Sequence, residues 1–164
     1  MFYGPHQRDL RIGRRRHILH VLTMSDSFST AFATLLHASG AAQARLESRL
    51  AACGLSGPKL LALQRLVEAG DSLPLGQLAD RLSCASSNVT QLVDRLEADG
   101  HVRREADPND RRSKLAVITP SGRKVYAAGA KILEAVEREL FAKFSKEEAL
   151  QLASFMARLE TSAD

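Results

Sequence analysis

The sequence predicts a mainly α-helical protein that carries one small β-hairpin. Most of the chain repeats apolar residues at the three- and four-residue spacing of amphipathic helices, with Ser, Pro and Gly at the expected starts and ends. One segment departs from this spacing, because two short β-type runs, 101–105 and 115–118, flank the turn-forming Asp-Pro-Asn-Asp at 107–110. An apolar fraction of 45% in 164 residues can support one domain with its own core.

The first two helices are expected before the hairpin. One covers about 27–53, where apolar residues fall mostly at helical spacings, and Gly54 ends the run. The next begins at Ser56, a good N-cap, with Pro58 in the first turn, where a missing N–H costs nothing. Leucines and a valine supply its buried side, and Gly70 closes it.

Two shorter helices follow. The third starts at Pro74, and its apolar residues recur at i, i+3, i+4 and i+7 from Leu75. A Ser-Cys-Ala-Ser turn joins it to a fourth helix over about 86–98, which has the same apolar spacing. Helix, turn, helix and then a basic hairpin is the order of a winged helix, a DNA-reading module, here over about 55–119.

The last two helices are expected after the hairpin. Thr119 caps a long helix over about 120–143, and a Ser-Lys-Glu-Glu capping box starts another over about 145–161. Together with 27–53, these helices lie outside the winged helix, and each carries an apolar stripe. Either they associate with a second copy or they pack on their own winged helix; the amount of apolar surface favours a homodimer.

Three stretches around the fourth helix and the hairpin carry a specific pattern. They read Leu92-Val-Asp-Arg-Leu-Glu97 with Asp99-Gly100, Asp107-Pro-Asn-Asp-Arg-Arg112, and Leu115-Ala-Val-Ile-Thr-Pro-Ser-Gly122. Together they resemble the MarR family of bacterial transcriptional regulators. The resemblance implies a single MarR-like domain over 24–164, in which long dimerisation helices flank a winged helix-turn-helix. It also implies a repressor that a small molecule releases from a palindromic operator.

The fourth helix is the expected base-reading element. In a helix-turn-helix the second helix enters the major groove, and its N-terminal residues meet the base edges. Among these polar residues, Asn88 and Gln91 can pair bidentately with adenine. Ala85 is a poor N-cap, which leaves open that Ser86 caps the helix instead of facing DNA. The expected DNA-facing residues are Ser86, Ser87, Asn88, Thr90 and Gln91, and a merely solvated polar face is the alternative.

The hairpin is the expected wing. Arg112 at its tip can enter a narrow minor groove, where negative potential is focused, and Asp110 can hold that guanidinium in a bidentate pair. The resemblance implies these roles for the matching Asp and Arg; an ordinary surface salt bridge is the alternative. Phosphate contacts are expected from Arg95, Arg103, Arg111 and Lys114.

Positive charge is concentrated in two segments. Residues 1–23 and 101–124 carry +4 each, although the whole chain carries only +4. A local basic patch on a balanced body is typical of a phosphate-contacting surface, or it is a solvated charge run. Residues 1–23 are expected to be a basic extension, which either contacts the DNA backbone, is disordered, or precedes a true start at Met24. Histidines interrupt its apolar stretch, which argues against an export signal.

The remaining chemistry-bearing residues give weaker signals. Cys53 and Cys84 lie far apart and form no CxxC motif, so no disulfide or thiolate zinc site is expected. The cytoplasm is the default compartment. Both thiols are expected to be buried and inert. The alternative is a thiol-redox switch. His37 lies near the position where the resemblance implies an effector pocket; it can bond a phenolic or carboxylate effector, or it is a half-buried interface residue.

Several classes of function are not expected. The sequence has no Gly-rich phosphate loop, no nucleophile elbow and no metal-ligand spacing among its histidines, so we predict neither an enzyme nor a cofactor or metal site. No apolar run approaches the roughly 18 to 20 residues that span a membrane. The predicted partners are double-stranded DNA, a second copy and a small-molecule effector. The alternative from another class is a winged-helix protein-interaction module without DNA binding.

Overall fold

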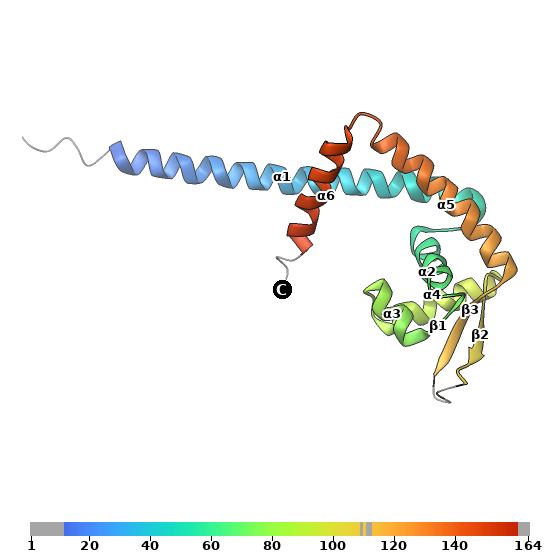
Figure 1. Cartoon of the computed structure of the whole chain (residues 1–164). Helices are drawn as coiled ribbons and strands as arrows, with labels where there is room; N and C mark the ends of the chain where they lie inside the picture. The colour runs from blue at the N-terminus through green and yellow to red at the C-terminus, as the bar shows by residue number, and fades with distance from the viewer. Residues whose placement is uncertain (1–11, 109, 111–112, 161–164) are drawn as a thin grey trace, which may run out of the picture. The chain divides into compact units, whose positions relative to one another are not determined.

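The computed structural model describes residues 12–108, 110 and 113–160. Figure 1 shows the predicted class, because helices dominate and the strands form one small sheet. The chain divides into two compact units, Met1–Ala42 and Gln43–Asp164. Among the described residues, no helix combines the length and the apolar character that crossing a membrane requires.

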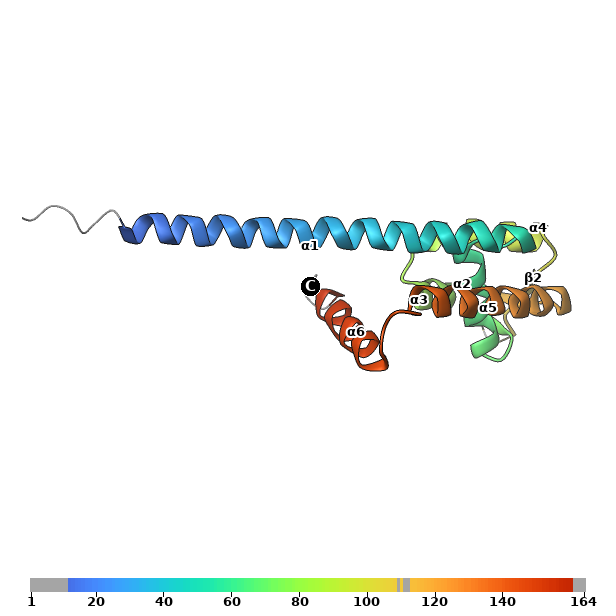
Figure 2. The ribbon, with the colours of Figure 1, turned by 90° about the horizontal axis from the view of Figure 1, so that it is seen from above.

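The first helix, α1 (Ile12–Leu50), is longer than the sequence indicated (Figure 2). It begins at Ile12 and not near residue 27, because a helical backbone needs residues of adequate helix propensity but no apolar stripe. It ends as expected: a 3₁₀ turn (Ala51–Cys53) follows Leu50, and Gly54 takes the left-handed conformation at φ 72°.

Three helices build the helical part of the winged helix. They are α2 (Gly57–Glu68), α3 (Leu75–Leu82) and α4 (Ser86–Ala98). Ser56 caps α2 as predicted, since its hydroxyl oxygen accepts the N–H of Lys59. The N-cap of α4 is Ala85, which forms no side-chain capping bond, and Ser86 is the first helical residue.

The sheet contains one strand that the sequence did not reveal. The strands β1 (Ser72–Pro74), β2 (Val102–Ala106) and β3 (Lys114–Ile118) lie in the antiparallel order β1-β3-β2. The predicted hairpin is β2 and β3. The additional strand β1 has only three residues and ends in proline, so it shows no alternation that a sequence pattern could detect.

The hydrophobic core lies within Gln43–Asp164. On α4 the buried side chains are Val89, Val93 and Leu96, which confirms the predicted apolar side. Burial of this side fixes the rotation of α4 about its axis and leaves its polar side exposed. The core also contains Leu50, Leu55, Leu60, Ala62, Leu63, Leu66, Leu73, Leu78, Ala79, Val102, Ala116 and Ile118.

Two helices follow the sheet, α5 (Pro120–Leu140) and α6 (Lys146–Glu160). The first ends at Leu140, slightly before the expected end at 143. The predicted capping box of α6 is present: the N–H of Ser145 donates to Glu148 Oε2 at 2.8 Å, and the N–H of Glu148 donates to Ser145 Oγ at 3.2 Å.

The start of α5 is joined to the turn between α4 and β2. The N–H of Thr119 donates to the carbonyl of His101 at 3.0 Å. Its hydroxyl donates to the carbonyl of Gly100 at 2.7 Å and accepts the N–H of Gly122 at 3.0 Å, which confirms the predicted cap. A Cβ at Gly122 would overlap the carbonyl oxygen of His101, so this close approach requires glycine.

An exposed ion pair connects the last turn of α1 to α5. Arg49 donates two hydrogen bonds to the carboxylate of Glu139, each 2.8 Å long. These bonds raise the pKa of Arg49 and lower the pKa of Glu139, because each charge stabilises the other. Both side chains are close to half exposed, so the pair contributes little to the stability of the fold.

Large apolar side chains remain exposed on the helices outside the winged helix. On α1, Phe28, Phe32 and Leu36 recur at four-residue spacing and are 68%, 62% and 56% exposed. On α6, Phe155 and Leu159 have the same spacing and are 48% and 54% exposed. Such contiguous apolar stripes are typical of surfaces that another chain covers.

Candidate nucleic-acid interface

The polar side of α4 presents the predicted base-reading residues to solvent. Ser86, Ser87, Asn88 and Gln91 lie in the first two turns and are all exposed. Thr90 is exposed as well, but its hydroxyl donates to the carbonyl of Ser86 at 3.0 Å. Thr90 therefore keeps an acceptor but no side-chain donor for a base edge, and the donors and acceptors of Asn88 and Gln91 are better suited to reading DNA.

Backbone hydrogen bonds also form between β2 and β3 in the chain connection beyond the last β-pair. Ala106 and Lys114 close the ladder, and Lys114 is exposed at the start of β3. Beyond them the N–H of Asp107 donates to the carbonyl of Ser113 at 3.3 Å, and the N–H of Ser113 donates to the carbonyl of Asp110 at 2.9 Å. Asp110 is exposed in this connection.

Part of the predicted wing lies outside the described residues. Arg111 and Arg112 belong to this part, so the pair of Asp110 with Arg112 stays a prediction. The remaining predicted phosphate contacts are exposed: Arg95 on α4, Arg103 on β2 and Lys114 on β3.

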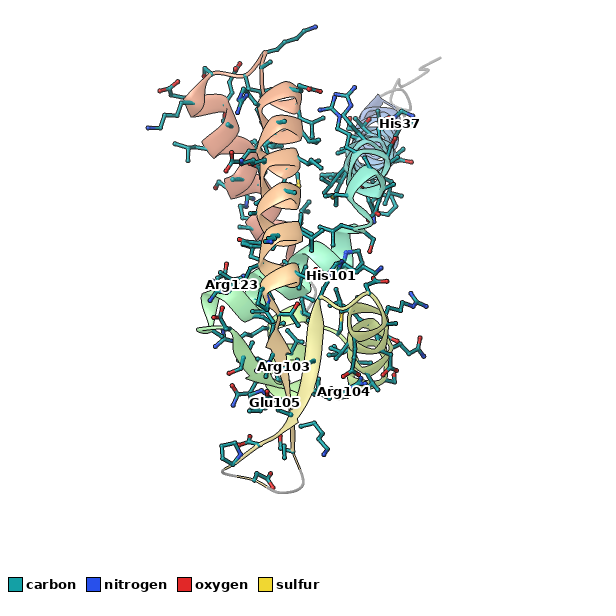
Figure 3. All side chains as sticks on the ribbon, turned by 90° about the vertical axis from the view of Figure 1, so that its right-hand side faces the viewer. His37, His101, Arg103, Arg104, Glu105 and Arg123 are labelled. Carbon is teal, nitrogen blue, oxygen red and sulfur yellow. The ribbon has the colours of Figure 1, made fainter. Side chains whose placement is uncertain are left out.

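Arg103 already has an acidic neighbour. Its Nε lies 2.6 Å from Glu105 Oε1 on the same strand, and the two side chains are 61% and 45% exposed (Figure 3). Residues two apart on a strand share one face, which explains the contact. Because the pair is exposed and weak, a phosphate can compete for the guanidinium.

Arg104 is a residue of this region that the sequence patterns did not single out. Its side chain is only 24% exposed and contacts α4 through Asp94 and Glu97 (Figure 3). Strand alternation was the signal that could have found it, because it places Arg104 on the opposite face of β2 from Arg103 and Glu105.

The cysteines differ from the prediction of two buried thiols. Cys84 is exposed, because the turn after α3 passes through left-handed backbone at Ser83 (φ 49°) and leaves Cys84 on the outside. Cys53 is half-buried, packs against the core and donates its thiol to the carbonyl of Leu50 at 3.2 Å. The expectation of a buried thiol is therefore wrong for Cys84, whereas the expectation that it is inert stays a prediction.

The remaining predictions concern a small-molecule effector and a metal ion. His37 lies exposed on α1. In the part of the chain that the structure describes, no group of three or more His, Cys, Asp or Glu side chains could hold a metal ion.

Comparison with known sequences supports the resemblance. The MarR family profile matches residues 55–114. YsmB of Bacillus subtilis, an uncharacterised HTH-type transcriptional regulator, is 31% identical over 94 residues, which are 57% of this chain and 64% of that regulator. The matched part thus spans less than two thirds of this relative.

Comparison with solved structures extends over more of the chain. A MarR-family transcriptional regulator from Silicibacter pomeroyi is 30% identical with a TM-score of 0.64, over 82% of this chain and 90% of that one. Sco3205 from Streptomyces coelicolor, a MarR-family regulator solved in complex with DNA, is 24% identical with a TM-score of 0.77, over 82% and 86% of the two chains. At this identity the second likeness shows the fold alone. With its three-helix, three-strand winged helix and these matches, the chain belongs to the MarR family of transcriptional regulators.

Proposed function

We propose that this protein is a homodimeric regulator that binds double-stranded DNA through α4 and the hairpin. One observation carries the proposal: α4 exposes a polar side while it buries Val89, Val93 and Leu96 in the core. The exposed polar residues are Ser86, Ser87, Asn88 and Gln91. A helix held in this way presents its polar groups in a fixed direction, as a major-groove reader requires. The exposed cations Arg95, Arg103 and Lys114 supply phosphate contacts that position the protein without reading sequence.

The sharpest test of this proposal is whether the affinity for DNA rises or falls when the acidic residue of the wing is replaced. We expect Arg112→Ala to cost about 1 to 3 kcal/mol per wing, roughly ten- to a hundredfold in affinity, because groove insertion is lost. Asp110→Ala should weaken binding nearly as much, because Asp110 orients that guanidinium. Simple electrostatics predicts the opposite sign, since deleting an acid near DNA should tighten binding. Fluorescence anisotropy with a duplex that the wild-type protein has selected from a random library measures both.

A variant of the recognition helix serves as the contrast. Gln91→Ala should relax the sequence preference more than it lowers affinity for scrambled DNA, because base contacts specify and phosphate contacts position. If Asp110→Ala binds DNA more tightly and Arg112→Ala leaves the affinity unchanged, the wing does not contact DNA as proposed. The alternative of a protein-interaction module would then be preferred.

The basic extension, residues 1–23, gives a second test, which concerns the electrostatic contribution to DNA binding. We expect deletion of residues 1–23 to flatten the dependence of log K on log salt by roughly 0.9 for each DNA phosphate that the extension neutralises in the wild-type protein. Because this deletion also removes the start of α1, a matched variant replaces Arg14, Arg15 and Arg16 with glutamine and keeps the chain length. An unchanged slope in both variants would show that the extension does not contact DNA.

The exposed apolar stripes support the homodimer. Phe28, Phe32 and Leu36 on α1 and Phe155 and Leu159 on α6 would be covered by a second copy. A dimer presents two copies of α4, and a palindromic site then offers two half-sites about one helical turn apart. Binding to both half-sites therefore depends on the helices outside the winged helix, because these helices would form the dimer.

We propose further that the protein is a repressor whose affinity for DNA falls when a small molecule binds. An effector that changed the distance between the two α4 helices would cost the dimer one half-site. The exposed His37 on α1 is a candidate contact for a phenolic or carboxylate effector. DNA binding upstream of the protein's own gene, with and without phenolic ligands, tests this part.

The exposure of Cys84 supports one alternative, a thiol-redox response on the same scaffold. A redox sensor needs an exposed thiol that is also readily ionised, and Cys84 satisfies the first requirement. Thiol reactivity of the folded protein, compared between Cys84→Ser and Cys53→Ser, decides whether it satisfies the second.

A further inference from the structure

We infer that Arg104 is a positioning residue of the DNA interface, which holds the hairpin at a fixed angle to α4. The inference rests on the proposed DNA-binding function. It concerns how the recognition helix and the wing are kept in register with one duplex, and it assigns this task to a residue that does not face DNA.

The guanidinium of Arg104 reaches from β2 to three acceptors on α4 (Figure 3). Its Nη1 lies 2.6 Å from Asp94 Oδ1 and 2.9 Å from Glu97 Oε2, and its Nη2 donates to the carbonyl of Thr90 at 3.2 Å. These three residues follow the i, i+4, i+7 spacing and therefore share one face of the helix. One side chain thus spans two turns of α4.

The backbone of Arg104 takes part in the same contact. Its N–H donates to Glu97 Oε1 at 3.0 Å. Among the described strands β2 is an edge strand that pairs only with β3, so this N–H would otherwise have no partner within the described sheet. Glu97 therefore binds the strand with one carboxylate oxygen and the guanidinium with the other.

Charge and exposure separate Arg104 from a phosphate contact. Two carboxylates, Asp94 and Glu97, surround its single positive charge, so it contributes little net attraction to DNA. Its 24% exposure contrasts with the 61% of Arg103, which lies on the opposite face of the same strand. Its contribution is geometric, because a planar guanidinium that contacts three acceptors fixes direction as well as distance.

The consequence for DNA binding is specificity. Base contacts from α4 and groove contacts from the hairpin tip form together only when the two elements keep one relative angle. Without the Arg104 bridge, sequence-specific binding should therefore weaken, whereas scrambled DNA, bound through exposed cations, should be almost unaffected.

The test uses the full chain and two duplexes, one that the wild-type protein selects from a random library and one of scrambled sequence. Arg104→Lys keeps the charge, but a compact ammonium cannot reach all three acceptors. We expect about tenfold lower affinity for the selected duplex, less than about twofold change for the scrambled one, and an unchanged salt slope. The matched control is Arg65→Lys: Arg65 is 33% exposed and pairs with Glu68 on its own helix, so it connects no two elements. It should leave both affinities within about twofold.

A second variant tests the inference independently in case Arg104→Lys destabilises the fold. Glu97→Gln keeps the shape of the side chain and removes a negative charge near DNA. Electrostatics alone predicts tighter binding to both duplexes, whereas the inference predicts weaker binding to the selected duplex only. If Arg104→Lys is unfolded at the assay temperature, this comparison decides alone.

The outcomes distinguish a failure of this inference from a failure of the proposed function on which it rests. A wild-type protein that selects no duplex overturns the proposed function, and the inference with it. If the wild-type protein selects a duplex, two results overturn the inference alone. In the first, Arg104→Lys changes the affinities as little as Arg65→Lys does. In the second, it lowers the affinities for both duplexes equally. Glu97→Gln binding tighter to the selected duplex has the same meaning.

Discussion

We expect Phe155→Glu to yield a monomer or an aggregate and to abolish binding to DNA. Phe155 is 48% exposed on the apolar side of α6, and the proposed dimer would bury it against the second copy. A carboxylate at this place would have to be desolvated in the dimer without a partner, which costs roughly several kcal/mol in each subunit. Light scattering should find the wild-type protein near 36 kDa, about twice the 17.9 kDa chain, and the variant either near the mass of one chain or as a large aggregate.

The control for this variant adds the same charge to the same helix. Gln151 is exposed and polar, so Gln151→Glu should remain a dimer with wild-type affinity for DNA. A stable Phe155→Glu monomer that retains full DNA affinity would show that this stripe is not the dimer interface.

Gly122→Ala destabilises the fold by about 2 to 4 kcal/mol, and this is the largest stability effect that we expect from a single methyl group. The added Cβ would overlap the carbonyl oxygen of His101, which belongs to the backbone and cannot turn away. The N-terminus of α5 must then move away from the turn between α4 and β2. Chemical denaturation at one fixed protein concentration measures the change, because dimers unfold in a concentration-dependent way.

The sign of this prediction is its informative part. Glycine to alanine inside a helix normally stabilises by up to about 1 kcal/mol. Gly76 on α3 is the matched control, because a Cβ there would meet no described atom within 4 Å, and Gly76→Ala should follow the normal rule. Equal stabilisation by both substitutions would contradict the close approach at Gly122.

Helix starts could be predicted from the sequence because capping is local. Ser56, Thr119 and Ser145 each bind an N–H within three residues, and all three caps are present. The strand β1 could not be predicted, because its three residues are defined by pairing with β3, more than forty positions along the chain. The start of α1 was predicted too late for another reason: an apolar stripe reports burial, and a helical backbone continues without it.

The candidate interface shows the same division between local and tertiary information. Helical periodicity separates the polar side of α4 from its buried side, so the exposure of Asn88 and Gln91 follows from sequence alone. The role of Arg104 depends on how closely β2 approaches α4, which no local pattern states. The exposure of Cys84 likewise depends on the left-handed backbone at Ser83, a residue type that gives little warning of it.

The joint between Thr119 and the turn at Gly100 and His101 has a thermodynamic consequence. Its hydrogen bonds attach the start of α5 to the turn that follows α4, so a displacement of α5 would be transmitted through this turn to the proposed DNA-reading helix. Coupling through such a joint is reciprocal: an effector that lowers the affinity for DNA by some factor has its own affinity lowered by DNA by the same factor. Effector titrations with and without a bound duplex therefore give the coupling free energy, even before the effector's contacts on the protein are known.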